Sequence, residues 1–235
     1  NPSSLRNGLM MVNSSQPKPM HIYSALYPDA AHLNKFGELE TVYHPTQLTN
    51  KNSILILHGG QDISPSIYGH KPSRMTGADE QLSARDLSEV LLAERAIELG
   101  IPIFGICRGA QLSCALAGGT LVQHVEGHVG NNHDVITTDN QILSTSTCHH
   151  QMMNPWDIEH ELLAWSAPSL SNVYIGEHEK LLDIPKEPEV VFFPKIKALA
   201  IQGHPEWMAT AEPFVQYCLK LVEEKLLCSS TKSIH

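Results

Sequence analysis

The stretch Gly105-Ile106-Cys107-Arg108-Gly109 decides the fold, because it joins a short apolar run to a helical one with no loop between them. Residues 101–106 predict a strand, and residues 110–117 predict a helix that stops at Gly118-Gly119. Glycines two positions before and two positions after a reactive side chain are typical of a nucleophile elbow, where the absent Cβ atoms let strand and helix approach closely. We therefore expect Cys107 at a sharp turn on the carboxyl edge of a sheet.

The position of Cys107 at such a turn predicts its chemistry. The N-terminus of the following helix favours the thiolate, so we expect a lowered pKa for the Cys107 thiol, and the backbone N–H of Arg108 would point at a developing oxyanion. A free cysteine is more often a small buried hydrophobe, an interpretation that suits Cys114, Cys218 and Cys228. It suits Cys107 less well, because a core cysteine does not require flanking glycines at the junction of two elements.

Short β-type runs alternate with helical patterns on both sides of the elbow, which is typical of a parallel sheet covered by helices on both faces. The run 53–57 is apolar throughout and is followed by Gly59-Gly60, as expected of a central strand. Further strands are predicted at 21–26, 41–44, 120–123, 133–138, 141–147, 172–178, 190–193 and 198–202, several of them antiparallel, and further helices at 30–38, 83–99 and 211–227. The 235 residues thus predict one α/β domain over 20–235, after a loose leader over 1–19.

A thiol that attacks an amide needs a base for its proton and an acid for the leaving nitrogen, and histidine serves both purposes near neutral pH. Fourteen histidines make any single one weak evidence, but His204 follows the apolar run 198–201 and begins the segment His204-Pro205-Glu206. Pro205 stiffens the turn, and Glu206 can hydrogen-bond the imidazole and fix its tautomer. His-Pro-Glu alone is equally consistent with an ordinary strand-end turn. Its combination with the elbow favours a catalytic triad of Cys107, His204 and Glu206.

A third segment, His58-Gly59-Gly60, follows the central strand directly. A glycine pair at this edge of the sheet would supply a second oxyanion N–H, beside that of Arg108. As a phosphate-binding loop the segment fails, because it lacks the Lys-Ser/Thr ending and a helix directly after it.

Together these segments resemble the class I glutamine amidotransferase superfamily, and the fuller pattern is similar to its γ-glutamyl-γ-aminobutyrate hydrolase branch, peptidase C26. The similarity runs from about residue 54 to 206. Besides the elbow, the glycine pair and His-Pro-Glu, it includes Asp62-Ile63, Pro65, Tyr68-Gly69, Arg85-Asp86, Glu89, Gln111, residues 117–121, Gln123, His128, His133, His149-His150-Gln151 and Gln202. The chain departs from the branch at residues 145–148 and at Gly203. These departures bear on the leaving group and leave the triad intact.

The resemblance implies a three-layer class I glutamine amidotransferase-like fold with a mostly parallel central sheet and a nucleophile elbow. It implies Cys107 as nucleophile, His204 as base and Glu206 as its orienting partner, with the backbone of Gly60 and Arg108 forming the oxyanion hole. Groups that bind the glutamyl α-amino and carboxylate groups would come from Gly59, Gln111, His149, His150 and Gln151.

Three functions are consistent with these residues. The first is a cysteine-dependent hydrolase that cleaves a small-molecule γ-glutamyl amide through a thioester, releasing glutamate and an amine. The second is a glutaminase subunit that donates ammonia to a separate synthetase partner, since the acyl half-reaction is the same. The third, a catalytically silent regulatory scaffold, is disfavoured by the intact Cys107, His204 and Glu206.

Composition and spacing exclude several other classes. A net charge of -9 without a basic run argues against direct nucleic-acid binding, and no apolar stretch approaches the roughly 20 residues that span a bilayer. Five scattered cysteines favour a reducing compartment, the cytoplasm, over a disulfide framework. Adjacent side chains in Cys148-His149-His150 would point to opposite faces of a strand, and no second Cys/His pair has zinc spacing, so we expect no metal site and no cofactor. A homo-oligomer is compatible with the sequence, which contains no signal that decides oligomeric state.

Overall fold

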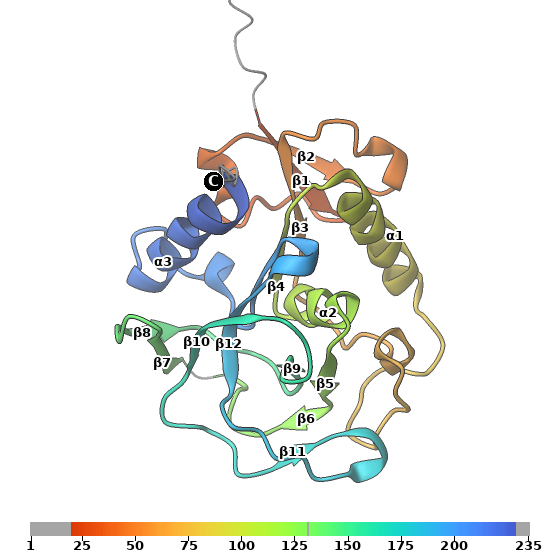
Figure 1. Ribbon diagram of the computed structural model, residues 1–235, viewed down its shortest axis with the longest axis vertical. Helices are drawn as coiled ribbons and strands as arrows, with labels where there is room; N and C mark the ends of the chain where they lie inside the picture. The colour runs from red at the N-terminus through yellow and green to blue at the C-terminus, as the bar shows by residue number, and fades with distance from the viewer. Residues whose placement is uncertain (1–19, 131, 229–235) are drawn as a thin grey trace, which may run out of the picture.

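A nine-stranded sheet runs through the computed structural model, which describes residues 20–130 and 132–228 (Figure 1). The strand order is β2-β1-β3-β4-β13-β12-β10-β7-β8. The strands are β1 (His21–Ala25), β2 (Glu38–Val42), β3 (Ser53–Leu57), β4 (Ile103–Ile106), β7 (His133–Thr137), β8 (Ile142–Thr145), β10 (Glu161–Ser166), β12 (Pro188–Phe193) and β13 (Ala198–Ile201). The leader predicted over 1–19 lies outside the described residues.

The first five strands of this order pair in parallel, and the last four pairings are antiparallel. All strands except β12 and β7 therefore point the same way, and the sheet is mostly parallel as predicted. Every residue of β3, β4 and β13 is buried, as expected of strands covered on both faces. Because β3, β4 and β13 are neighbours, their carboxyl ends meet at the centre of one edge of the sheet.

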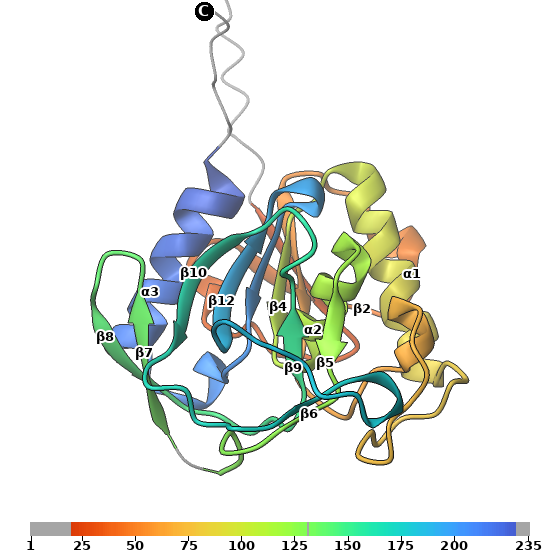
Figure 2. The same ribbon diagram turned by 60° about the horizontal axis from the view of Figure 1, so that its bottom comes forward.

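Helices cover both faces of the sheet, with α1 (Ala84–Leu99) and α2 (Arg108–Ala117) on one side and α3 (Pro213–Leu221) on the other (Figure 2). Alternate residues of a strand serve the two layers. In β3, Leu55 and Leu57 pack with α1 and α2, whereas Ile54 and Ile56 pack with α3. The result is the predicted three-layer α/β architecture, and the described residues include no helix long and apolar enough to cross a membrane.

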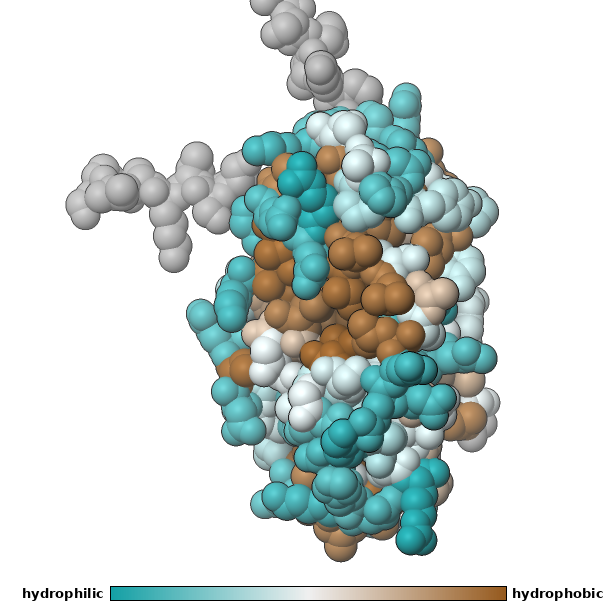
Figure 3. All heavy atoms as spheres, turned by 90° about the vertical axis from the view of Figure 1, so that its right-hand side faces the viewer, coloured by the Kyte–Doolittle hydropathy of each residue, from teal (hydrophilic) through white to brown (hydrophobic). Residues whose placement is uncertain are grey.

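Helix α1 is well capped but has an apolar outer face. The Ser83 hydroxyl accepts the N–H of Asp86, whose carboxylate accepts the Ser83 N–H, and Gly100 closes the helix in the left-handed conformation. Leu87 and Leu91 remain about half exposed on the outer face. Apolar side chains gather on the side of the molecule where α1 lies (Figure 3).

Two small antiparallel pairs lie beside the main sheet and shape the segments near its carboxyl edge. They join β5 (Thr120–Val122) to β9 (Met152–Asn154), and β6 (His124–Val125) to β11 (Tyr174–Ile175). The pairs fix the ends of two segments, of which the described residues 126–130 and 146–151 are irregular and contact each other through the Val129–Cys148 bridge.

The structure corrects several predicted elements. The helix predicted at 30–38 is wrong: only the 3-10 turn Leu33–Lys35 forms, because Ala31 and His32 have positive φ and Glu38 already begins β2. The helix predicted at 211–227 is α3 followed by a π-helical turn over Val222–Leu227, and the strand predicted at 172–178 shrinks to Tyr174–Ile175. Strands β6, β9 and β10 were not predicted. The other 3-10 turns are Pro45–Gln47, Pro65–Tyr68, Glu177–Glu179, Pro194–Ile196 and Pro205–Trp207.

Candidate active site

The predicted reactive residues meet at the carboxyl edge of β3, β4 and β13. Gly59 and Gly60 follow β3, Cys107 follows β4 directly, and His204 follows β13. Because these strands are adjacent and parallel, three segments more than 40 residues apart in sequence reach one place. The sheet itself thus positions the site.

Cys107 stands in a strained turn between β4 and α2. Its backbone has φ 48° and ψ -105°, a conformation that non-glycine residues rarely adopt and that often marks functional sites. The two flanking glycines are sterically required. A Cβ at Gly105 would lie 2.5 Å from the Gly109 carbonyl oxygen, and a Cβ at Gly109 would overlap the Leu57 carbonyl. The nucleophile elbow predicted from the glycine spacing is therefore present.

Burial governs the acidity of Cys107, contrary to the sequence-based expectation. Desolvation raises the pKa of the thiol to about 12, and hydrogen bonds from the backbone of Arg108 and Gly60 offset only part of that effect. The expected lowering by the N-terminus of α2 is therefore outweighed. Burial therefore favours the thiol form of Cys107 at neutral pH, and a nucleophilic role for its sulfur would require a neighbouring base.

His204 is held on three sides. Its Nδ1 lies 2.7 Å from Glu206 Oε1, and since a carboxylate only accepts, Nδ1 donates and Nε2 keeps its lone pair. The Trp207 ring stacks flat on the imidazole with centroids 3.6 Å apart. The backbone is fixed by the His204 N–H, which donates to Ser146 O at 3.0 Å. This tautomer leaves Nε2 available as a base.

Gly59 separates His204 from Cys107. A Cβ on Gly59 would lie 2.8 Å from His204 Cε1 and 3.5 Å from Cys107 Cβ, so the imidazole and the nucleophile flank the same small residue. Glycine is needed at this point for space, since any side chain would push the histidine away.

Arg85 from α1 braces the segment that carries Gly59 and Gly60. Its Nη2 donates to the carbonyls of His58 at 3.1 Å and Gly59 at 2.8 Å, and its Nε donates to Glu89 at 2.9 Å. Glu89 also pairs with the buried Arg108 guanidinium. One ion-pair network therefore joins the glycine segment to the elbow helix.

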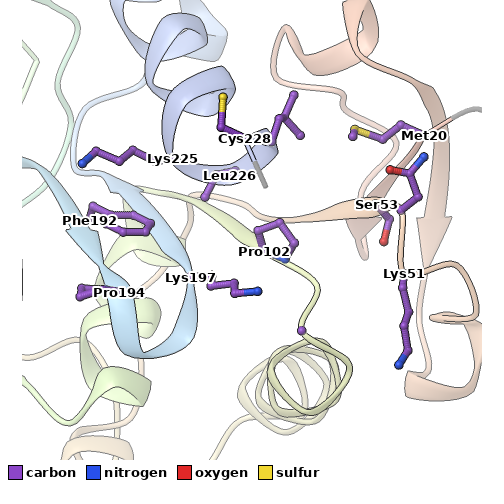
Figure 4. A pocket seen from close by; sticks show the side chains of 13 residues that line it. Met20, Lys51, Ser53, Pro102, Phe192, Pro194, Lys197, Lys225, Leu226 and Cys228 are labelled. Atoms are coloured by element: carbon purple, nitrogen blue, oxygen red, sulfur yellow. The ribbon is translucent and has the colours of Figure 1, made fainter. Parts of the chain in front are cut away.

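A cavity of about 420 Å³ opens above Cys107, within the ~300–1,000 Å³ typical of small-molecule sites. Its walls are Tyr27, Asp29, His58, Gly59, Gly60, Cys107, Cys148, His204, Glu206 and Trp207. A second cavity, of about 380 Å³, lies at the opposite edge of the sheet near Ser53, Pro102 and Lys197, and contains none of the predicted site residues (Figure 4).

Comparison with known proteins agrees with this geometry. Residues 40–167, more than half of the chain, match the family model described as Peptidase C26. The chain belongs to the peptidase C26 family. Membership of this family indicates an enzyme of the cysteine amidohydrolase type.

Individual relatives are consistent with the family. The glutamine amidotransferase-like protein YvdE of Lactococcus lactis is 28% identical over 173 residues, which cover 68% of each chain. A Mycobacterium tuberculosis protein, provisionally named a glutamine amidotransferase, is 38% identical over 78 residues, which cover 33% of this chain and 25% of that protein. Matches to the first three curated relatives cover 25%, 36% and 28% of their lengths.

A solved structure shows the same fold. The glutamine amidotransferase of Thermotoga maritima is 14% identical, with a TM-score of 0.53 over 88% of this chain and 86% of that one. The class I glutamine amidotransferase-like fold predicted from the sequence is confirmed.

The two departures from the peptidase C26 pattern touch each other. A Cβ at Gly203 would lie 2.8 Å from Ser146 O and would also overlap the Thr145 hydroxyl. The segment 145–148 therefore packs into the space that a larger residue before His204 would fill. In the same segment, Cys148 lines the cavity, and its carbonyl oxygen lies 4.0 Å from Cys107 Sγ.

Of the predicted substrate-binding residues, only Gly59 lines the cavity. Gln111 is buried and donates to Gln151 O at 3.0 Å. His149 and Gln151 are buried as well, and the His149 N–H already donates to His128 O at 2.9 Å. The His150 ring is partly exposed and lies 3.0 Å from Asp62. None of these four residues therefore contributes to the cavity wall.

Several cavity residues were missed by sequence reasoning. Tyr27 and Asp29 follow the carboxyl end of β1, and Trp207 follows Glu206 directly. Their signal was position: in a parallel sheet, the residues just after a strand gather at the carboxyl edge. Cys148 had no such signal, because it stands in an irregular segment.

A buried histidine–glutamate cluster lies behind the same wall. One ligating atom from each of His128, His149 and Glu189 lies within 4.8 Å of the others, although no metal site was expected. Burial lowers the pKa of His149 to about 3. Burial also acts to lower the pKa of His128, but hydrogen bonds to Glu187 and Glu189 raise it to about 9.

Proposed function

We propose that this chain is a hydrolase that cleaves a γ-glutamyl amide through a thioester on Cys107. The observation that carries the proposal is the meeting, across Gly59, of a nucleophile-elbow cysteine and a histidine whose far nitrogen donates to a carboxylate. Cys107 is the nucleophile, His204 the base and Glu206 its orienting partner. Membership of the peptidase C26 family supports the acyl chemistry.

In the first half-reaction, His204 Nε2 takes the Cys107 proton as the sulfur attacks the amide carbon. The carbonyl oxygen becomes an oxyanion that accepts from the N–H groups of Arg108 and Gly60, both of which already hydrogen-bond the nucleophile. The tetrahedral intermediate then expels nitrogen, which receives the proton from His204. The products are a free amine and a thioester.

In the second half-reaction, a water molecule loses a proton to His204 and attacks the thioester carbon. The carbon–sulfur bond breaks, the proton returns to Cys107 and glutamate leaves. Glu206 keeps its charge in both steps and stabilises the imidazolium.

The cavity wall favours an amine larger than ammonia. Tyr27 and Trp207 expose aromatic surface, with 42% and 61% exposed area, and the wall includes the carboxylates of Asp29 and Glu206. Among the described residues, no lysine or arginine lines this cavity. A leaving amine with an apolar chain and a second positive charge fits this lining.

The second candidate is a glutaminase that donates ammonia to a synthetase partner. The names of the relatives, which refer to glutamine amidotransfer, favour it. This function requires glutamine as the substrate, and it needs no space for a longer leaving amine.

One experiment separates these functions. Purified protein is incubated with glutamine, γ-glutamyl-aminobutyrate and γ-glutamyl-polyamines, and released glutamate is measured. We expect the γ-glutamyl-polyamines to be cleaved faster than γ-glutamyl-aminobutyrate, whose leaving amine bears a carboxylate, and Cys107→Ala to abolish cleavage. Cys228→Ala is the matched control, since it removes an exposed thiol far from the cavity.

Two results would overturn parts of the proposal. Undiminished cleavage by Cys107→Ala would remove the nucleophile assignment. Cleavage of glutamine alone, and only after a synthetase is added, would establish the ammonia donor instead.

A further inference from the structure

Three side chains from separate segments converge in the interior behind the cavity wall. His128 lies between β6 and β7, His149 precedes β9, and Glu189 lies in β12. Their side chains have 0%, 1% and 0% exposed area, and one ligating atom of each lies within 4.8 Å of the others. Such a group needs internal partners, since water does not reach it.

Both histidines are oriented through the nitrogen that faces away from the cluster. His149 Nδ1 donates to Gln151 O at 2.8 Å, and His128 Nε2 donates to Glu187 Oε2 at 3.1 Å. The remaining nitrogens, His149 Nε2 and His128 Nδ1, are buried and face Glu189, and neither meets the geometry of a regular hydrogen bond among the described residues. A carbonyl or carboxylate on the far nitrogen is the arrangement that orients histidine ligands of metals.

Glu189 completes the group. Its Oε1 accepts from His133 Nε2 and from Ser166 Oγ, both at 2.9 Å, while its Oε2 is buried with no partner in the described part of the chain. Oε1 lies 3.3 Å from His128 Nδ1 and 3.9 Å from His149 Nε2. Acceptor atoms at this separation repel each other unless a cation or a proton lies between them.

We propose that His128, His149 and Glu189 bind one divalent transition-metal ion of the zinc type. Ligands about 2.0–2.1 Å from a tetrahedral zinc ion are about 3.4 Å apart. The observed 3.3 Å fits that geometry, and the observed 3.9 Å closes to it with a small rotation of the Glu189 carboxylate. Two imidazoles and one carboxylate are ligands that zinc prefers, and binding of the ion would displace any proton on the ligating nitrogens.

Hydrogen bonds around Glu187 fix the orientation of the His128 ring. Glu187 accepts from the N–H groups of Leu170 and Ser171, at 2.8 Å each, and from Tyr174 Oη at 2.9 Å. A carboxylate anchored by three further donors keeps the His128 ring fixed, which favours affinity for a metal.

A metal at this place would stabilise the segments next to the cavity wall. It would tie the segments that contain His128 and His149 to β12, and Cys148, the neighbour of His149, lines the cavity. The ion would not touch the reacting atoms. The proposal therefore does not depend on the hydrolase function.

The test uses the full chain after dialysis against a chelator. Zinc uptake is measured by mass spectrometry and Co²⁺ binding by its visible d–d spectrum, and the melting temperature is recorded with and without metal. We expect one equivalent, a spectrum without a thiolate charge-transfer band, and a higher melting temperature with metal. Cys107→Ala should bind the same amount, because no thiolate takes part.

Substitution identifies the ligands. His149→Asn and Glu189→Gln should weaken binding by at least about 100-fold, while His178→Asn, which removes a histidine 74% exposed, should have no effect. The wild-type spectrum keeps the proposal testable if a cluster variant fails to fold.

Three outcomes would overturn the proposal. The first is no uptake by the depleted wild type, which would leave a proton as the occupant. The second is a thiolate band in the cobalt spectrum. The third is unchanged binding by folded His149→Asn, which would assign the metal to surface histidines.

Discussion

Replacing Gly59 with alanine tests the placement of His204 without removing any functional group. The added Cβ would lie 2.8 Å from His204 Cε1. Carbon atoms in contact are about 3.5–4.0 Å apart, so the imidazole would have to move by roughly 0.7–1.2 Å. It cannot move freely, because Trp207 stacks on it and Glu206 holds Nδ1.

This displacement should affect the rate more than the fold. A misplacement of about 1 Å costs on the order of 10²-fold in rate, which is about 2.7 kcal/mol of activation free energy. Gly59 lacks the positive φ of Gly60, so alanine is not strained there by its backbone. We expect kcat for glutamate release from the best γ-glutamyl substrate to fall about 100-fold, with KM and the melting temperature near those of the parent.

Gly77→Ala is the matched control. Gly77 is an exposed glycine without positive φ, and its added Cβ would meet only the end of the Asp62 side chain, at 3.2 Å. We expect parental kcat. The reasoning is refuted if folded Gly59→Ala keeps kcat within about threefold of the parent, since the steric argument requires a displaced base.

Three further changes test neighbouring parts of the site. Glu206→Gln replaces an acceptor-only carboxylate with an amide whose N–H can donate to Nδ1 and favour the other His204 tautomer. We therefore expect kcat to fall on the order of 10³–10⁴-fold in steady-state assays, and a loss below tenfold would contradict the orienting role. Because burial raises the pKa of Cys107 to about 12, its alkylation by iodoacetamide, followed by peptide mass spectrometry, should accelerate about tenfold per pH unit from about pH 7 to 10. A plateau near neutral pH would show a stable thiolate instead. Arg85→Lys loses the guanidinium that contacts the carbonyls of His58 and Gly59, so kcat should fall about tenfold with little change in KM. This loss is smaller than the 10²–10³-fold cost of removing an oxyanion donor. A kcat equal to that of the parent would show that Gly60 is positioned without Arg85.

The parts of the fold that could be predicted from the sequence are those with a local steric or hydrophobic cause. The run 53–57 is apolar at nearly every position because both of its faces are buried, and it is the strand β3. Gly105 and Gly109 marked the elbow because carbonyl groups occupy the space of their missing Cβ atoms. Each of these features is visible within a few residues.

Elements that depend on distant partners were not predictable in the same way. The segment 30–38 has a helical composition, yet Ala31 and His32 adopt positive φ as the chain turns from β1 toward the edge strand β2. Strand β10 was missed because its position depends on pairing with β12 and β7, which lie on either side of it in the sheet. Local periodicity contains no information on such partners.

In the candidate site, too, residues that follow neighbouring strands could be predicted from the sequence, and residues from unrelated segments could not. Cys107, His204 and Gly60 follow strands that are neighbours, so motif and topology predict their meeting. The cluster of His128, His149 and Glu189 has no spacing pattern, because its members come from three segments. Glu189 also follows Lys186-Glu187-Pro188, which looks like a polar turn, although Glu187 and Glu189 are both fully buried.

The raised pKa of Cys107 changes what the histidine must do. Burial raises the pKa of the Cys107 thiol well above neutral, so the thiol form is favoured at pH 7. A preformed thiolate would need His204 only to protonate the leaving amine, whereas a buried thiol needs it from the first step. Attack must therefore be coupled to proton transfer, and this explains why the structure fixes the tautomer of His204 through Glu206 and its ring plane through Trp207. The burial that favours the thiol form of Cys107 is thus the same feature that makes an oriented base necessary.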